Sequence, residues 1–377
     1  MDYKILFLDP HASGVGVNLV NRFYTTPNFS KLFFFSEGMA KGDISSLVYC
    51  GSSFALGRVP MPIILNRIIS VVEFFLWRHY NNIFSNYIIA SLSKKIECNI
   101  IIDSNIPFRG REKYLEKLYK QNKNIRFIFY VSHIHFNTEE KIKLFKKFPN
   151  SLFFSESRPI FKDTDSKKII NKNNFFHCSY GVNKKFFSLD NILKNRGEKI
   201  LVTGSILETK GNESIELFKY FGSESIHKDR GFLFKNKNKL NYLFNNIAEY
   251  YIPGSVNNYF KHDIVKQYGS HKYFICPEDA TGMPSVNMLE GMAMGCVYFG
   301  NINYTYFEEY KMEEWVHFIP HNGSIKSIES AFYRVQNDPE LFKKIQDQGA
   351  LLVRSKYSMK STYKRFESSL KLCLKRN

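Results

Sequence analysis

Residues 276–295 constrain the fold of this chain more than any other segment, because they have the pattern of a strand, a glycine-containing turn and the start of a helix. The strand is predicted at residues 272–276, which are rich in aromatic and β-branched side chains. Gly282 can adopt a positive φ in the turn, and Pro284 suits the first turn of the helix that follows. Unpaired backbone amides at such a helix start face an anion, so the segment predicts a phosphate-binding βα unit.

Glu290 lies one turn into the predicted helix. Acidic residues of other nucleotide-binding βα units accept hydrogen bonds from ribose hydroxyls, and Glu290 is placed for that role. A second interpretation is equally open at this point. Glu290 would then be a solvated glutamate in the first turn, favoured by the positive end of the helix dipole.

Short apolar runs alternate with helical patterns along the chain, which indicates an α/β protein with parallel sheets. Strands are predicted at residues 4–8, 99–102, 126–131 and 152–154, and again at 199–203, 231–234, 250–252, 273–276 and 316–319. Helices are predicted at residues 18–23, 325–336, 339–348 and 361–373. Since 377 residues exceed what one hydrophobic core usually organises, we expect two doubly wound halves that divide near residues 182–197.

The sequence lacks the motifs of several other enzyme classes. Leu19 stands where a dinucleotide fingerprint needs its third glycine, which disfavours a hydride-transferring Rossmann enzyme. No G-x-S-x-G elbow supports a serine hydrolase. His133 and His135 follow the strand at residues 126–131, but no acid stands beside them at the spacing of metal ligands, so we expect no metal site.

The run Leu-Glu-Gly-Met-Ala-Met-Gly-Cys-Val-Tyr-Phe at residues 289–299, with an acidic loop, a glycine and a proline before it, resembles the donor-nucleotide motif of retaining GT-B glycosyltransferases. Family 4 is the most similar. That family usually has Glu-x7-Glu, in which Glu290 matches the second acid and Gly282 occupies the position of the first. Glu278 and Asp279 are the nearest carboxylates to that position.

The first half of the chain contains further motifs of this family in the expected order. Residues 11–17 resemble its glycine-rich loop after the first strand, and residues 152–157 resemble its Ser-Glu-Ser segment late in the first domain. Residues 180–186 are similar to the Gly-Val-Asp-x-x-x-Phe signature that closes that domain. With the motifs downstream, the resemblance covers about residues 4 to 370.

The second half continues with the family's phosphate-binding motifs. Residues 199–204 have the pattern of a buried strand that ends in a glycine, and residues 208–211 resemble the Lys-Gly turn. In the family the lysine of that turn, here Lys210, binds the donor phosphate. Ser205 stands where the family often has an arginine, so one of two expected phosphate-binding cations is missing.

The resemblance implies a GT-B fold, in which two doubly wound Rossmann-like domains face each other across a cleft and the C-terminal helix crosses back to the N-terminal domain. Residues 1–183 would bind the acceptor, residues 184–355 the nucleotide-sugar, and residues 356–377 would form the crossing helix.

The resemblance also implies a retaining, metal-independent transfer of a sugar from a nucleotide-sugar to a glycan or lipid-linked acceptor, in bacterial surface polysaccharide or lipopolysaccharide synthesis. It places a histidine that contacts the donor sugar at a strand end, where His133 fits best and His135 is second. The implied catalytic residues are Lys210, His133 and Glu278. The implied donor-binding residues are Glu290, Gly282, Met283, Pro284, Ser285, Gly204, Ser205, Gly14 and Gly16. No cofactor is expected.

The formal net charge of +18 and the pI of about 9.4 indicate an anionic partner, such as a nucleotide donor, a polyanionic glycan or a membrane surface. No zinc finger, RNP motif or basic helix supports nucleic-acid binding, so we expect none. Two other functional classes stay open. One is a non-catalytic GT-B-like protein that binds glycans or acts as a scaffold, and the other is a basic peripheral binder of membranes or nucleic acid.

Residues 61–78 form the most apolar segment, but Arg67, Glu73 and Arg78 interrupt it too often for a bilayer span. We favour a buried helix of the first domain there. An interfacial helix on anionic lipid, anchored by Trp77, is the alternative. Six scattered cysteines without a C-x-x-C pair and the lack of a signal-peptide pattern predict a cytoplasmic protein with reduced thiols, with contact to the inner face of the cytoplasmic membrane as an extension.

Overall fold

The computed structural model divides the chain into two compact units, Met1–Ser179 with Thr362–Asn377 and Tyr180–Ser361. The boundaries expected from the sequence are 183/184 and 355/356. The structure describes residues 4–8, 49–50, 98–103, 116, 119–120, 126–131, 138–156, 164–171, 173–188, 192–209, 211–251 and 262–376.

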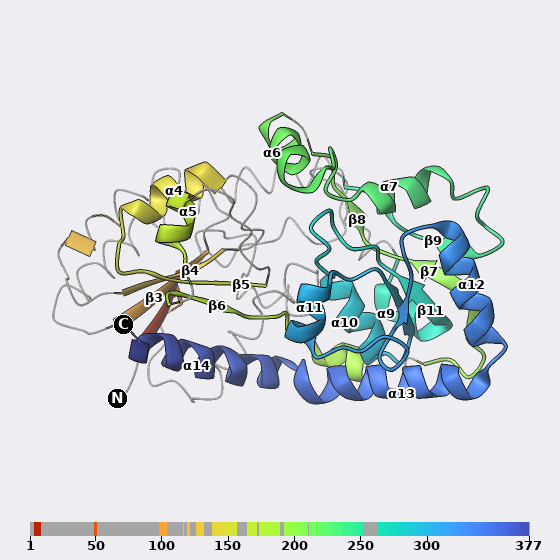
Figure 1. Cartoon of the computed structure of the whole chain (residues 1–377). Coiled ribbons are helices and arrows are strands. Elements are labelled where there is room, and N and C mark those ends of the chain that lie inside the picture. Colours follow the sequence, from red (N-terminus) through yellow and green to blue (C-terminus); the bar gives the residue numbers. More distant parts are fainter. Residues whose placement is uncertain are drawn as a thin grey trace, which may run out of the picture. The chain divides into compact units, whose positions relative to one another are not determined.

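The first unit contains a parallel six-stranded sheet in the order β2-β1-β3-β4-β5-β6 (Figure 1). Its strands are β1 (Lys4–Leu8), β2 (Tyr49–Cys50), β3 (Cys98–Asp103), β4 (Arg126–Tyr130), β5 (Leu152–Ser155) and β6 (Phe175–His177). The helices α4 (Thr138–Lys146) and α5 (Thr164–Ile169) connect the last three strands. The four strands predicted in this half are therefore confirmed, and their parallel pairing follows from the helical connections between them.

The final helix α14 (Met359–Arg376) contributes its residues from Thr362 onward to the same unit. The ring of Phe366 packs against Phe154 and Phe176, with centroid distances of 5.0 and 5.6 Å. Arg365 donates a hydrogen bond of 3.0 Å to the hydroxyl of Ser179. The apolar face predicted for this amphipathic helix therefore lies on the ends of β5 and β6.

The second unit is built on a parallel five-stranded sheet in the order β13-β12-β11-β7-β9. Its strands are β7 (Gly197–Val202), β9 (Phe244–Asn246), β11 (His271–Ile275), β12 (Val297–Gly300) and β13 (Ile319–Pro320). A separate parallel pair joins β8 (Ser205–Ile206) to β10 (Glu249–Tyr250). The helical elements are η2 (Lys184–Phe187), α6 (Asn212–Phe221), α7 (Lys228–Lys235), α9 (Ile264–Ser270), α10 (Val286–Ala293), α11 (Tyr304–Tyr310), α12 (Ile325–Gln336) and α13 (Pro339–Lys356).

Both faces of this sheet are covered, which is why its strands read as continuous apolar runs. Leu201, Phe274 and Tyr298 belong to one core cluster with the buried residues of α9, α10 and α11. Ile200 and Tyr273 point to the opposite face, into a second cluster with α12 and the start of α13. The layers produce the doubly wound arrangement predicted for this half.

Three strand predictions differ from the structure. Of residues 250–252, Tyr250 belongs to β10, Tyr251 lies outside it, and residue 252 is outside the described ranges. Residues 231–234, predicted as a strand, lie in α7, because Arg230 and Leu233 are buried on one side at helical spacing while Phe232 is exposed. Of residues 316–319, only Ile319 belongs to a strand. The predicted helix at 325–336 is confirmed, and the one at 339–348 continues to Lys356.

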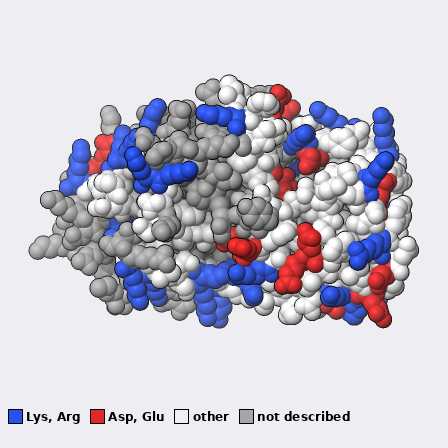
Figure 2. Space-filling model, in the orientation of Figure 1, with Lys and Arg blue, Asp and Glu red and all other residues white. Residues whose placement is uncertain are grey.

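The described surface carries both signs of charge. Figure 2 shows lysine, arginine, aspartate and glutamate side chains interspersed over the described part of the second unit on this face. No helix within the described ranges is long and apolar enough to cross a membrane. Residues 18–23 and 61–78, for which the sequence predicts helices, lie outside those ranges. The four cysteines whose side chains are described, Cys178, Cys276, Cys296 and Cys373, are buried, as expected.

Candidate donor-binding site

The loop that follows β11 is held in one conformation by the side chain of Asp279. Its Oδ1 accepts hydrogen bonds from the amide and hydroxyl of Thr281, at 2.8 and 2.5 Å, and from the amide of Met283 at 3.2 Å. The amide of Gly282 donates to the Asp279 carbonyl at 2.9 Å. Gly282 has φ 75°, and an added Cβ would lie 2.7 Å from the Cβ of Asn303, so glycine is required there for two reasons.

The helix start after this loop differs in detail from the prediction. Ser285 is the N-cap of α10 and its hydroxyl accepts from the amide of Asn287, so Pro284 precedes the cap and does not lie in the first turn. The amides of Gly282 and Met283, expected to face phosphate, are instead used by Asp279 within the loop. At this helix start, Ser285 and Val286 have the amides for which the structure describes no acceptor.

Glu290 is completely buried in α10. The interpretation of Glu290 as a solvated first-turn glutamate is therefore wrong. Its charge acts on Lys185 of η2 and on the hydroxyl of Tyr268 in α9. Burial lowers the pKa of Lys185 to about 8, against the opposing effect of Glu290, and burial together with the Glu290 charge raises the pKa of Tyr268. A carboxylate kept at this depth requires polar neighbours, which α9 and η2 supply.

Glu278 lies at the same strand end and is also buried. Its Oε1 accepts from the hydroxyl of Tyr298 at 2.6 Å and from the amide of Asn301 at 3.1 Å. Burial raises the pKa of Glu278 from 4.5 to about 7, although these two hydrogen bonds oppose the shift. This carboxyl group can therefore hold or release a proton near neutral pH.

Arg230 of α7 is a charged residue at this edge that sequence reasoning missed. Its guanidinium donates from Nε to the Pro277 carbonyl at 2.7 Å and from Nη1 to the Ser205 carbonyl at 3.1 Å. Gly204, with φ 104°, lies two residues after the end of β7, and an added Cβ there would lie 2.9 Å from the Sγ of Cys276 and 3.4 Å from the Cζ of Arg230. A single arginine beside a short apolar run that looked like a strand offered no signal of this position.

The structure brings together most of the predicted residues that it describes. Gly204 lies between β7 and β8, Ser205 begins β8, and residues 278–285 follow β11, so both groups lie at the carboxyl edge of adjacent parallel strands. Lys210, His133, Gly14 and Gly16 lie outside the described residues. Within the described ranges, no group of three or more histidine, cysteine, aspartate or glutamate side chains could hold a metal ion.

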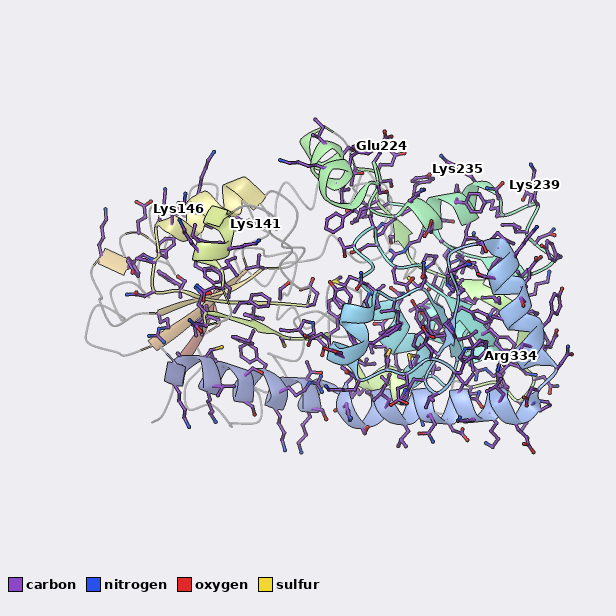
Figure 3. All side chains as sticks on the ribbon, viewed as in Figure 1. Lys141, Lys146, Glu224, Lys235, Lys239 and Arg334 are labelled. Atoms are coloured by element: carbon purple, nitrogen blue, oxygen red, sulfur yellow. The ribbon has the colours of Figure 1, made fainter. Side chains whose placement is uncertain are left out.

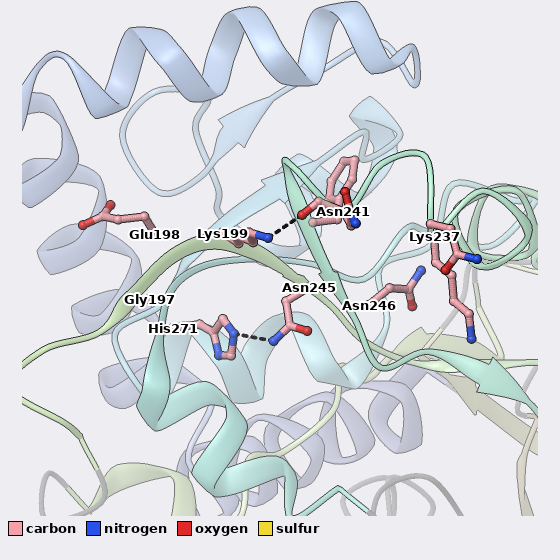
Figure 4. A pocket seen from close by; sticks show the side chains of 10 residues that line it. Gly197, Glu198, Lys199, Lys237, Asn241, Asn245, Asn246 and His271 are labelled. Carbon is pink, nitrogen blue, oxygen red and sulfur yellow. Dashed lines mark hydrogen bonds between the residues drawn. The ribbon is translucent and has the colours of Figure 1, made fainter.

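Two hollows lie in the second unit away from this cluster. One, of about 420 Å³, opens at the amino ends of β7, β9 and β11, where Asn245 donates to His271 and Lys199 donates to the Asn241 carbonyl (Figure 4). The other, of about 730 Å³, lies between α6 and the segment after β8, and Glu224 and Lys235 are among its lining residues (Figure 3). The first is at the edge of the sheet opposite to the predicted donor-binding residues.

No protein-family model matches the chain, and no curated protein matches its sequence. Solved structures do match. HepE from Anabaena, crystallised with UDP, aligns with a TM-score of 0.53 at 11% identity, covering 98% of this chain and 99% of that chain. Sucrose-phosphate synthase from Thermosynechococcus elongatus aligns with a TM-score of 0.53 at 10% identity, and a glycosyltransferase from Rickettsia africae with a TM-score of 0.50 at 15% identity, each covering 100% of both chains.

These neighbours are GT-B glycosyltransferases, and the alignments span almost the entire chain. The chain therefore has the GT-B fold that its motifs predicted. The cleft and the crossing of the final helix stay predictions.

Proposed function

We propose that the protein is a retaining, metal-independent glycosyltransferase that moves a sugar from a nucleotide-sugar to a glycan or lipid-linked acceptor in the synthesis of bacterial surface polysaccharide or lipopolysaccharide. The observation that carries the proposal is the complete burial of Glu290 in the helix that follows a glycine turn at the carboxyl edge of a parallel sheet. Ligands of open α/β sheets bind at this edge. A buried carboxylate in that helix fits an acceptor for ribose hydroxyls.

The donor class follows from the fold and from the same edge of the sheet. HepE was crystallised with UDP and with UDP-glucose. For the present chain, UDP and UDP-glucose are therefore the first probes, followed by the other nucleoside diphosphates and their sugars. The reaction would take place at the inner face of the cytoplasmic membrane.

In the proposed reaction, the bond between the sugar C1 and the diphosphate oxygen breaks, and a bond from C1 to the acceptor oxygen forms on the same face. The acceptor hydroxyl passes its proton to the departing diphosphate. Negative charge grows on the leaving oxygen, so fixed cations and backbone amides at that point accelerate the step. The family resemblance assigns this role to Lys210, and the amides of Ser285 and Val286 can add to it.

The test is a thermal shift screen of the full chain with UDP, GDP, ADP, CDP and dTDP and their sugars. A ligand at 100 times its dissociation constant adds about 2.7 kcal/mol to stability, so one nucleotide class should raise the Tm by several degrees. Release of nucleoside diphosphate from the matching sugar, with and without added glycan acceptors, then measures turnover. If no nucleotide raises the Tm at millimolar concentration, the proposal is wrong.

A second candidate is a GT-B-like protein that binds glycans without catalysis. It is favoured by the loop after β11, where Gly282 replaces the first acid and Asp279 uses its carboxylate to hold the loop. Such a protein could bind a nucleotide-sugar or a glycan but would not break the sugar-phosphate bond. Nucleotide binding without any diphosphate release, over a panel of acceptors, would favour this candidate.

A further inference from the structure

Arg230 is almost fully buried and yet uses only part of its hydrogen-bonding capacity. Nε and Nη1 bond to the carbonyls of Pro277 and Ser205, whereas Nη2 donates no hydrogen bond to any residue that the structure describes. The two bonded carbonyls follow β11 and begin β8, so they orient the guanidinium at the carboxyl edge of the sheet. A planar guanidinium with one side held in this way presents its remaining N–H groups in a defined direction.

The guanidinium of Arg230 forms no ion pair within 4 Å in the described part of the chain. Glu278 and Asp279 are nevertheless near enough for the arginine to lower the pKa of each. Burial raises the pKa of both carboxyls and works against their ionisation. A buried cation normally requires a charged partner, because desolvation is costly. An anionic ligand at this edge would supply that partner.

Gly204 lets the backbone that leads from β7 to β8 approach the guanidinium closely. An added Cβ there would lie 2.9 Å from the Sγ of Cys276 and 3.4 Å from the Cζ of Arg230. Two of the loop amides expected to hold phosphate are used by Asp279. Among the described residues, Arg230 of α7 therefore supplies positive charge at the carboxyl end of β11.

We propose that Arg230 binds the diphosphate of the nucleotide donor, in place of the arginine that the family often has at the position of Ser205. The inference rests on the proposed function and adds a residue to it. Arginine suits this role because the N–H donors on one side of its guanidinium can match phosphate oxygens while those on the other side stay bonded to the protein. Pro277 and Ser205 keep the guanidinium in place before the ligand binds.

Calorimetric titration of purified variants with the nucleoside diphosphate selected by the thermal shift screen, and with the matching monophosphate and nucleoside, tests the inference. Arg230→Gln should weaken diphosphate binding at least about tenfold, the scale of a lost hydrogen bond to a charged group, and should leave nucleoside binding within about twofold. Arg230→Lys keeps the charge but loses the fork, so it should weaken diphosphate binding at least about threefold with nucleoside binding again unchanged. The lysine variant decides the question if the glutamine variant does not fold.

Arg196→Gln is the matched control. Arg196 is half-buried and also bonds to carbonyls, those of Gly295 and Tyr268, but it lies before β7 at the other edge of the sheet. Its loss should lower the Tm without changing diphosphate affinity by more than about twofold. If Arg230→Gln weakens diphosphate binding and nucleoside binding equally, or leaves the diphosphate affinity unchanged, the inference is overturned while the proposed function still stands. A wild-type protein that binds no nucleotide would overturn the proposed function itself.

Discussion

The two edges of the second unit's sheet treat charged side chains differently. At the carboxyl edge, Arg230, Glu278 and Glu290 are buried. At the amino edge, Lys272 and Glu198 form an ion pair with side chains that are 35% and 50% exposed. The hollow of Figure 4 lies at the amino edge, whereas these buried ionisable side chains lie at the other.

This difference favours the carboxyl edge as the donor-binding edge that we propose. Burying a charge costs several kcal/mol unless bonds compensate, so a fold seldom keeps three charged groups at one buried edge without a use for them. Exposed ion pairs cost little and contribute about 0 to 1 kcal/mol, so the amino edge can carry them without consequence. Changes at the two edges should therefore have different effects on nucleotide binding and turnover.

The largest effect is expected from Lys210, the lysine to which the family resemblance assigns phosphate binding. With Ser205 in the position of the family arginine, Lys210→Ala should lower turnover at least about 100-fold, or about 2.7 kcal/mol, because it removes a charge that stabilises the leaving diphosphate. Steady-state release of diphosphate from the selected nucleotide-sugar measures it. Lys239→Ala, which removes an exposed lysine of the same unit, is the control. Turnover within about threefold of wild type would exclude Lys210 from the mechanism.

Glu278 should make the stability of the second unit depend on pH. Its pKa is raised in the folded state to about 7, so the folded protein retains a proton that the unfolded chain loses near 4.5. The stabilisation is complete below pH 4.5 and is lost as the pH rises through 7, which amounts to roughly 3 kcal/mol. Glu278→Gln should remove this dependence.

Urea unfolding followed by Trp315 fluorescence measures the effect in the second unit alone, in a Trp77→Phe background. The stability of wild type relative to Glu278→Gln should fall between pH 4.5 and 8. A difference that stays constant over this range would mean that Glu278 is ionised throughout, held so by Arg230 and the Tyr298 hydroxyl.

Glu290→Gln should weaken nucleotide binding by about 1.5 to 3 kcal/mol, the range for hydrogen bonds to a charged group, and should leave folding nearly intact because the two side chains have the same shape. Titration with the nucleoside distinguishes this residue from Arg230. Loss of the Glu290 carboxylate should weaken the binding of the nucleoside and of the nucleoside diphosphate equally, since both ligands contain the ribose. If the nucleoside binds to Glu290→Gln as tightly as to wild type, Glu290 has a structural role with Lys185 and Tyr268.

Much of the fold could be predicted because its strands are buried on both faces and separated by polar turns. Residues 4–8, 126–131 and 273–276 are apolar runs of strand length, and their helical connections imply parallel pairing. Residues 231–234 are as apolar as those runs, but their conformation depends on contacts of Arg230 and Leu233 that the local sequence does not contain. A run of four apolar residues fits a strand and a helix equally well.

The residues of the candidate site also fall into two groups, those that could be proposed from sequence and those that could not. Glu290 and Gly282 could be proposed from sequence because their proposed roles depend on spacing within one strand-turn-helix segment. Arg230 could not, since its partners Pro277 and Ser205 are 47 and 25 residues away in sequence. The use of the Gly282 and Met283 amides was equally hidden, because it depends on which way the Asp279 side chain turns.

The smallest effect is expected at the amino edge of the sheet. Lys199 and Lys237 line the hollow of Figure 4 and are exposed, so Lys199→Ala and Lys237→Ala each remove the same charge as Lys210→Ala does. Because exposed charges contribute at most about 1 kcal/mol and are screened by salt within about 10 Å, nucleotide affinity and turnover should stay within about twofold of wild type in 0.1 M salt. Calorimetry and the diphosphate-release assay check both quantities. A fivefold or larger loss in either variant would show that general positive charge, and not the buried groups at the carboxyl edge, governs nucleotide binding.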